Sequence, residues 1–178
     1  EKAPSIVVTK TAAPTSVAEP GGSVLFKVDI KNTSDATDPV TITSLTDNIH
    51  GNLDGQGTCD VPVTIQPGVT WSCSFSASVS GAPGYVETDT VTASGADNEG
   101  TPVSGSDDAT VTITDVLPDI SVTKTAAPTS VPETGGNVTF TFLVKNNSLE
   151  AATITSLSDN KFGPLAGDAD CKVDTVLA

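Results

Sequence analysis

The sequence predicts an all-β fold, and three observations lead to this prediction. The chain of 178 residues contains 27 threonines and 21 valines, whose branched Cβ atoms favour extended strands. Its 15 glycines and 12 prolines interrupt the strand-forming runs at short intervals. No stretch of ten or more residues shows the 3.6-residue hydrophobic period of a helix. We therefore expect antiparallel sheets and little helix.

Alternation of apolar and polar residues predicts the individual strands. The clearest case begins at Trp71, where apolar residues alternate with five serines, as in a strand with one buried face. Turn sequences such as Pro67-Gly68 and Pro83-Gly84 separate the runs. The seven strands expected in the first part of the chain are 6–11, 24–31, 40–45, 61–65, 71–80, 86–93 and 109–114.

An internal repeat sets the domain organisation. Residues 5–34 are identical to residues 119–148 at 19 of 30 positions, and TITSLTDN at 41–48 returns as TITSLSDN at 153–160. The repeat length of about 114 residues suits one seven-stranded immunoglobulin-like sandwich. We expect tandem immunoglobulin-like antiparallel β-sandwiches, the first over residues 1–116 and the second, incomplete, over residues 117–178. The short joint between them contains Pro118 and should be semi-rigid.

The second unit ends about halfway through the repeat, and two explanations stay open. Residues 117–178 are a fragment of a longer array, or another copy completes the half-sandwich in a filament, since open strand edges promote association. Cys171 aligns with Cys59, so we expect the natural chain to continue and to place its partner beyond residue 178. No signal peptide is found, so we expect a mature or excised chain.

The charge balance narrows the range of partners. The net charge is −14, from 22 acidic and 8 basic residues, and all eight basic residues are lysines. A chain without arginine and without a basic face is poorly suited to nucleic acid. No apolar run approaches the ~20 residues of a membrane-spanning helix. We expect an exported protein, extracellular, at the cell surface or secreted.

Several motifs occur once in each unit. In the second unit they are the runs Ile120-Ser-Val-Thr-Lys-Thr, Gly136-Asn-Val-Thr-Phe and Val144-Lys-Asn, followed by Ala152 and Asp159; the first unit has the same features from Ile6 to Asp47. In these features the chain resembles the tandem repeats called domain of unknown function eleven, found in very large bacterial and archaeal surface proteins. It departs from them where their Asn-x-Gly turn is Asn-x-Ser here. The resemblance implies an immunoglobulin-like fold in an exported protein and no chemistry.

Cys59 and Cys73 are candidates for a disulfide within the first unit. Their spacing suits a bridge across a loop, worth about 3 kcal/mol on the chain-entropy model. The alternative is a pair of buried free thiols. The absence of Cys-x-x-Cys pairs argues against zinc. A disulfide would indicate an oxidising compartment.

Catalysis has little support in the sequence. His50 is the only histidine, in a turn-like segment where we expect a solvated side chain, and no Gly-x-Ser-x-Gly motif is present. We expect a non-enzyme without an obligatory cofactor.

Acidic residues around one predicted hairpin connection suggest calcium. Asp97, Asn98, Glu99, Asp107 and Asp108 flank it, and calcium prefers several oxygen ligands. The alternative is a solvated acidic surface.

Lysines in the first strand of each unit suggest a second kind of chemistry. Alternation places Lys10 and Lys124 on the same face as apolar neighbours, and a buried lysine must be paired or crosslinked. Asp115 is the partner that strand parity favours for an intramolecular isopeptide bond with Lys10. The alternative is an edge-strand lysine that deters aggregation.

Three Asn-x-Ser/Thr sequons are candidates for glycosylation, at Asn32, Asn137 and Asn146. We expect Asn32 and Asn146 to be exposed at the end of the second strand.

Together these features predict a structural module of a surface stalk, adhesin shaft or filament, whose partners are neighbouring repeats or other copies. The alternative is a recognition module that binds a glycan or protein through the loops at one end of the sandwich.

Overall fold

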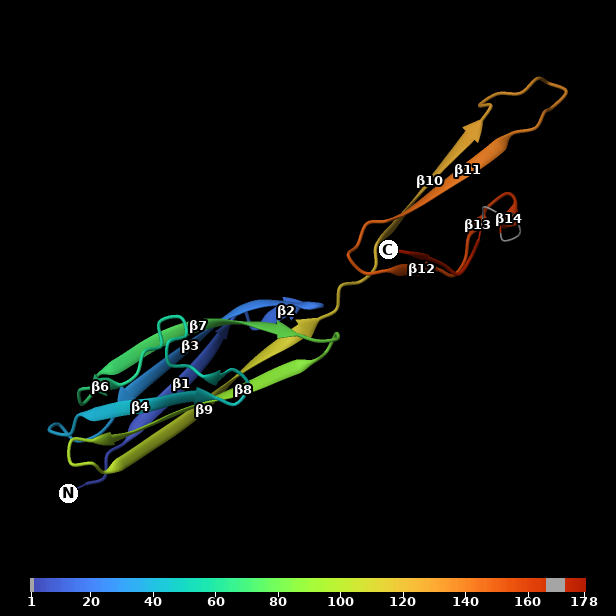
Figure 1. Ribbon diagram of the computed structural model, residues 1–178. Helices are drawn as coiled ribbons and strands as arrows, with labels where there is room; N and C mark the ends of the chain where they lie inside the picture. Colours follow the sequence, from blue (N-terminus) through green and yellow to red (C-terminus); the bar gives the residue numbers. More distant parts are fainter. Residues whose placement is uncertain (1, 166–171) are drawn as a thin grey trace. The chain divides into compact units, whose positions relative to one another are not determined.

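The computed structural model describes residues 2–165 and 172–178, and it divides into two compact units, Glu1–Asp115 and Val116–Ala178. The division falls one residue from the boundary that the repeat predicts. Every regular element in the described residues is a β-strand (Figure 1), which confirms the all-β prediction. Among the same residues, no helix of the length and apolarity needed to cross a membrane is found.

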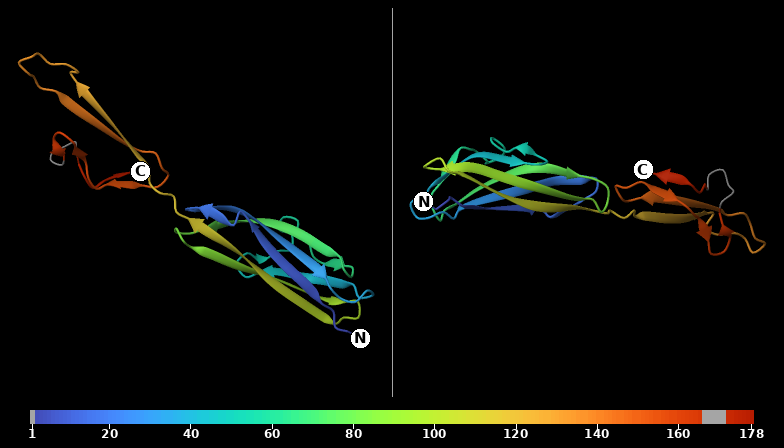
Figure 2. Two further views of the ribbon diagram at one scale, coloured as in Figure 1. Left: turned by 180° about the vertical axis from the view of Figure 1, so that it is seen from behind. Right: turned by 90° about the horizontal axis from the view of Figure 1, so that it is seen from below.

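Two sheets form the first unit (Figure 2). In the smaller sheet the order is β1-β3-β7, formed by β1 (Ile6–Ala13), β3 (Gly21–Asn32) and β7 (Thr70–Ser80). In the larger sheet the order is β2-β9-β8-β4-β5, and β6 pairs with β4. Its strands are β2 (Ser16–Ala18), β4 (Val40–Asp47), β5 (Gly51–Asn52), β6 (Val63–Ile65), β8 (Val86–Asp97) and β9 (Pro102–Thr114). Among the strand pairs of the described residues, the short β2–β9 pair alone is parallel.

The core lies between these two sheets, where their alternating apolar residues meet. Phe26 and Phe75 are its largest members, and they lie on neighbouring strands with ring centroids 5.3 Å apart. Leu53, just after β5, is also fully buried. The other fully buried large side chains come from both sheets: Ile30, Ile42, Leu45, Ile65, Ile113, Val24, Val28, Val40 and Val79. All seven predicted strands are present, with β2 and β5 as additional short strands.

The hairpin of β8 and β9 is longer than the sequence predicts. β8 continues to Asp97 and β9 begins at Pro102. Both strands therefore extend into residues 94–108, where the sequence contains glycines that usually interrupt strands. Gly95 is needed because a Cβ there would lie 1.9 Å from the carbonyl oxygen of Thr41, beside an irregularity in the β4–β8 register. The glycine therefore marks a close backbone approach within the sheet.

The second unit repeats the first hairpin. β10 (Ile120–Ala127) pairs with β11 (Thr139–Asn146) in the register that β1 has with β3. Short pairs follow, β12 (Ala152–Ile154) with β15 (Thr175–Leu177) and β13 (Ser158–Asp159) with β14 (Gly163–Pro164). Among its described residues, Ala152 is the one buried hydrophobic residue. Cys171 lies outside the described residues.

Candidate functional site

Lys10 is a buried cation between the two sheets of the first unit. It lies on β1 in phase with Val8, so its side chain points into the sandwich and is wholly buried. Its Nζ donates a hydrogen bond to Asp47 Oδ2 at 2.5 Å and lies 2.7 Å from Asp89 Oδ2. Asp47 ends β4, and Asp89 lies in the first half of β8. The larger sheet therefore presents two carboxylates to one ammonium group of the smaller sheet.

The partner predicted for Lys10 is wrong. Asp115 is exposed beyond the end of β9, and Lys10 Nζ contacts Asp47 and Asp89 instead. The backbone nitrogen of Lys10 donates a hydrogen bond to Asp107 Oδ2 at 2.7 Å. Asp107 is therefore the residue of β9 that lies beside Lys10. Asp115 is eight residues further along, about 26 Å at the rise of a strand. The alternation of side chains predicts which face of the sheet Asp115 lies on. It does not predict how far along the strand Asp115 lies from Lys10.

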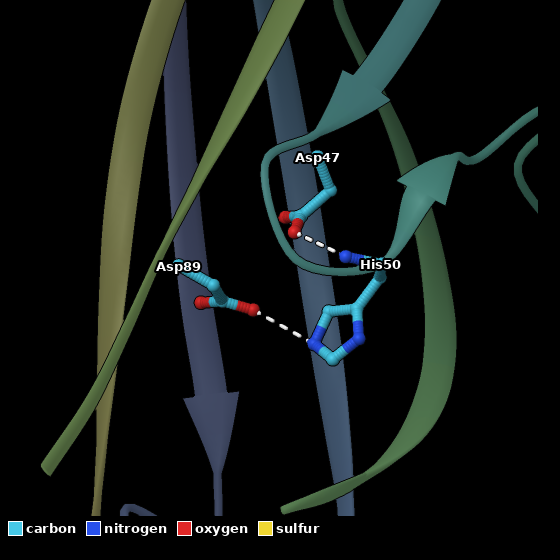
Figure 3. Close-up of side chains that lie close together, drawn as sticks. All are labelled: Asp47, His50 and Asp89. Carbon is cyan, nitrogen blue, oxygen red and sulfur yellow. Dashed lines mark hydrogen bonds and ion pairs between the residues drawn. The ribbon is translucent and has the colours of Figure 1, made fainter.

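Asp47 is fixed by the turn that follows β4. Its Oδ1 accepts hydrogen bonds from the backbone nitrogens of Ile49 and His50, each at 2.9 Å, and Figure 3 shows the one from His50. Burial alone would raise the pKa of the Asp47 carboxyl. The hydrogen bond from Lys10, those from the two backbone nitrogens and the charge of Lys10 outweigh burial and lower this pKa below its ordinary value of 3.8.

His50 is not the solvated loop histidine that its position suggests. The turn folds it over the core, where its ring centroid lies 5.3 Å from that of Phe26 and 5.6 Å from that of Phe75. Its Nε2 lies 3.0 Å from Asp89 Oδ2, and Figure 3 shows the two side chains directed toward one another. Glu87 Oε1 is 3.9 Å from the same nitrogen. His50 therefore closes the polar cluster on the side of the turn.

Ion pairs, rather than hydrogen bonds of good geometry, are the main contacts of the Asp89 carboxylate. Within the part of the chain that the structure describes, neither of its carboxylate oxygens has a hydrogen-bond partner of good geometry, although Oδ2 lies within ion-pair distance of Lys10 and His50. The rings of Phe26 and Phe75 border the ammonium, 4.8 Å and 5.8 Å from Nζ. Charges in such a place interact strongly because little water screens them.

The second unit contains a partial copy of this cluster. Lys124, the counterpart of Lys10, forms an ion pair with Asp159, the counterpart of Asp47. Asp159 Oδ1 accepts from the backbone nitrogens of Lys161 and Phe162, as Asp47 does from its own turn. These bonds and the pair with Lys124 lower the pKa of Asp159 below its ordinary value, with Lys124 as the largest cause.

The predicted disulfide between Cys59 and Cys73 is confirmed, with an S–S distance of 2.07 Å. It joins the loop between β5 and β6 to β7. Both cysteines are buried against the core.

The five calcium candidates do not come together. Asp107 pairs with Val91 in the middle of the β8–β9 ladder, about 17 Å along the strands from the turn at Asp97. The predicted group separates because β9 begins earlier than expected. A smaller group, Asp38, Asp97 and Glu99, brings its ligand oxygens within 4.8 Å of one another, and Asp38 is buried. Asn98 is exposed and donates a hydrogen bond to Glu99 Oε1, whereas Asp108 is exposed and outside this group.

Two of the three sequons are structural. Asn32 is fully buried rather than exposed, and its Nδ2 donates to the carbonyl oxygens of Asp38 and Ile65. Asn146 is half-buried and donates in the same way to the carbonyl oxygens of Glu150 and Leu177. Asn137 is exposed in the segment before β11. The prediction that Asn32 and Asn146 are exposed is wrong, because their side-chain amides turn inward and donate hydrogen bonds to backbone carbonyls.

Comparison with known proteins adds no relative: no protein-family model matches the chain, and no curated protein matches it significantly. The likeness to the repeats named above stays a prediction from the sequence.

Proposed function

We propose that the chain is a non-catalytic structural module of an exported protein, part of a surface stalk, adhesin shaft or filament. The observation that supports this function is the repetition of one arrangement in consecutive units. Each unit has a lysine on its first strand, an ion-paired aspartate held by its own turn, and a hairpin in the same register. Repetition of a scaffold is typical of modules that provide length rather than chemistry.

The burial of the polar cluster also supports a structural role. An enzyme needs a cleft in which substrate reaches its polar groups. The side chains of Lys10 and Asp47 are wholly buried, so a substrate would have to displace core residues to reach them. A metal ion at Asp47, His50 and Asp89 would likewise have to displace the Lys10 ammonium, which already contacts both carboxylates.

The disulfide supports export, since disulfides persist in oxidising compartments. The acidic surface suits a protein that must not associate at random, because copies with a net charge of −14 repel each other. The proposal includes a calcium ion bound by Asp38, Asp97 and Glu99, which would stabilise the β8–β9 turn. Calcium is bound by clustered carboxylate oxygens of this kind.

Electron microscopy of the native material tests the proposal, with millimolar calcium in one sample and a chelator in the other. We expect rows of sandwich-sized beads or regular fibres, and a less ordered appearance in chelator. Compact single particles in both samples would contradict a role in a stalk or filament.

A glycan-binding screen tests the alternative role in recognition. Tyr85 is 45% exposed at the turn between β7 and β8, and an exposed aromatic ring is the kind of group on which a sugar stacks. A structural module binds no glycan in the screen. Saturable binding that is lost in Tyr85→Ala would favour the recognition module instead.

A further inference from the structure

We propose that Lys10 and Asp47 become joined by an isopeptide bond inside the folded first unit, with Asp89 as the catalytic residue. Lys10 Nζ bonds to Asp47 Cγ, and one water molecule is released. Because Lys10 lies on the smaller sheet and Asp47 on the larger one, the bond links the two sheets covalently. This chemistry is independent of the role proposed for the chain outside the cell.

The fold holds the two reacting groups together. Lys10 Nζ lies 2.5 Å from Asp47 Oδ2, and both side chains are wholly buried. Positioning of this kind replaces an encounter in solution and can correspond to effective molarities of ~10⁵ M or more. The exclusion of water also favours condensation over hydrolysis, since water is the product of one and the reactant of the other.

Asp47 is the carboxyl group that is prepared for attack. Its Oδ1 accepts two backbone hydrogen bonds, from Ile49 and His50, and these donors would stabilise the negative charge of a tetrahedral intermediate. Its Oδ2 faces the lysine and is the oxygen that leaves. Asp89 has no comparable donors among the described residues, so an oxyanion formed on it would not be stabilised.

Asp89 is placed to move the protons. Its Oδ2 lies 2.7 Å from Lys10 Nζ and 3.0 Å from His50 Nε2, so it can take a proton from the ammonium and His50 keeps it in position. Asp89 passes this proton to Asp47 Oδ2, and the neutral amine attacks the Cγ of the neutral carboxyl group. Asp89 then carries a second proton from the nitrogen to Oδ2 as water leaves. In total, two of the three ammonium protons depart with Oδ2 as water, and Asp89 returns to its original state. No oxidant or cofactor is required.

The surroundings of the pair favour the product. The side chains of Lys10 and Asp47 are both wholly buried, and keeping separate ions away from water costs free energy. Condensation removes one positive and one negative charge from this interior and leaves a neutral amide.

The second unit supplies an internal comparison. Lys124 and Asp159 repeat the lysine–aspartate contact and the two backbone donors. Among the described residues, no other carboxylate lies within ion-pair distance of Lys124 Nζ, and the lysine side chain is 34% exposed. Within the part of the second unit that the structure describes, no carboxylate takes the place of Asp89, and water reaches the lysine side chain. We therefore expect the bond at Lys10 and not at Lys124.

The experiment is intact mass spectrometry of the purified chain, unfolded and with its disulfide reduced. The proposal predicts a mass one water molecule below that of the sequence. The full sequence mass would overturn the proposal, and so would a second loss of water that the digest assigns to a link between Lys124 and Asp159. Because Asp54-Gly55 can lose water by cyclising on its own backbone, a protease digest must also show Lys10 linked to Asp47. A link from Lys10 to Asp89 would overturn the assignment.

Four variants complete the test. Lys10→Arg keeps the cation and should keep its full sequence mass, whereas the matched control Lys124→Arg should still be one water molecule short. Asp47→Asn should release ammonia and give the same product mass as the natural sequence. Asp89→Asn should keep its full sequence mass. A loss of water in Lys10→Arg that the digest does not assign to Asp54-Gly55, or a Lys10–Asp47 link in Asp89→Asn, would contradict the mechanism.

Discussion

Asn32 shows how one buried polar residue can set the end of a strand. Its amide group donates to two backbone carbonyls, those of Asp38 and Ile65, and its Oδ1 accepts from the backbone nitrogen of Ser34. A buried amide is tolerated only when such bonds are made, so the residue fixes where the chain leaves β3. Asn146 makes the equivalent bonds in the second unit. The Asn-x-Ser sequence is therefore better explained by the fold than by a glycan.

Asp29 is the residue from which we expect a measurable pH dependence. It accepts hydrogen bonds from Lys27 Nζ and from Ser72 Oγ on the neighbouring strand, and these lower its pKa below the ordinary value, with Lys27 as the largest cause. A lowered pKa in the folded state means stabilisation that is present above the ordinary pKa and is lost as pH falls through the folded value.

Asp29→Asn should therefore reduce stability at neutral pH and matter less in acid. The effect should stay below about 1 kcal/mol because the pair is partly exposed. Melting temperatures of both proteins, measured from neutral pH down to about pH 2, should begin to converge below about pH 4 and should meet only below the lowered pKa of Asp29. A difference that stays constant over the whole range would show that the carboxylate is not responsible.

At the scale of the strands, alternation was sufficient to predict every long element, because a one-residue shift would reverse which side chains face the core. It also placed Lys10 on the apolar face of its strand, and left open whether the lysine is buried or lies at an edge. It could not predict which acidic residue Lys10 meets, because that depends on how β1 is placed along the opposing sheet. Asp89 carried a usable signal: it lies in phase with Val91 and Ala93 on the buried face of β8, where an aspartate needs a partner.

His50 carried no such signal. It comes after β4 in a turn, and turns are normally solvated. Only the hydrogen bonds of Asp47 to the backbone of that turn bring the ring over Phe26 and Phe75.

The disulfide should stabilise the first unit through the loop that it closes. The bridged cysteines are 14 residues apart, and a loop of this size corresponds to about 3 kcal/mol on the chain-entropy model. Replacing Cys59 and Cys73 together by alanine should lower the free energy of unfolding by about 2–4 kcal/mol, measured by denaturant titration. A thiol reductant should destabilise the natural sequence and leave the double variant unchanged. Equal sensitivity of the two proteins to the reductant would contradict this role.

At the scale of the molecule, the two units differ in how much apolar surface they bury. The core cluster of the first unit contains 20 buried residues from both sheets. In the second unit, among its described residues, Ala152 alone is buried, while Leu143, Phe162 and Val176 are each more than 60% exposed. Burial of apolar surface is the main favourable contribution to folding, so the stability of the two units should differ sharply.

We therefore predict that residues 1–115 produced alone unfold in one cooperative transition close to that of the whole chain. Residues 116–178 alone should show no cooperative transition, because a hairpin without a packed second layer is at best marginally stable in water. Differential scanning calorimetry of the whole chain and of the two pieces measures both. A separate heat-absorption peak from residues 116–178 would show that this unit forms a core of its own. The same peak appearing only at high concentration would show that copies complete one another, as expected for a filament built from half-sandwiches.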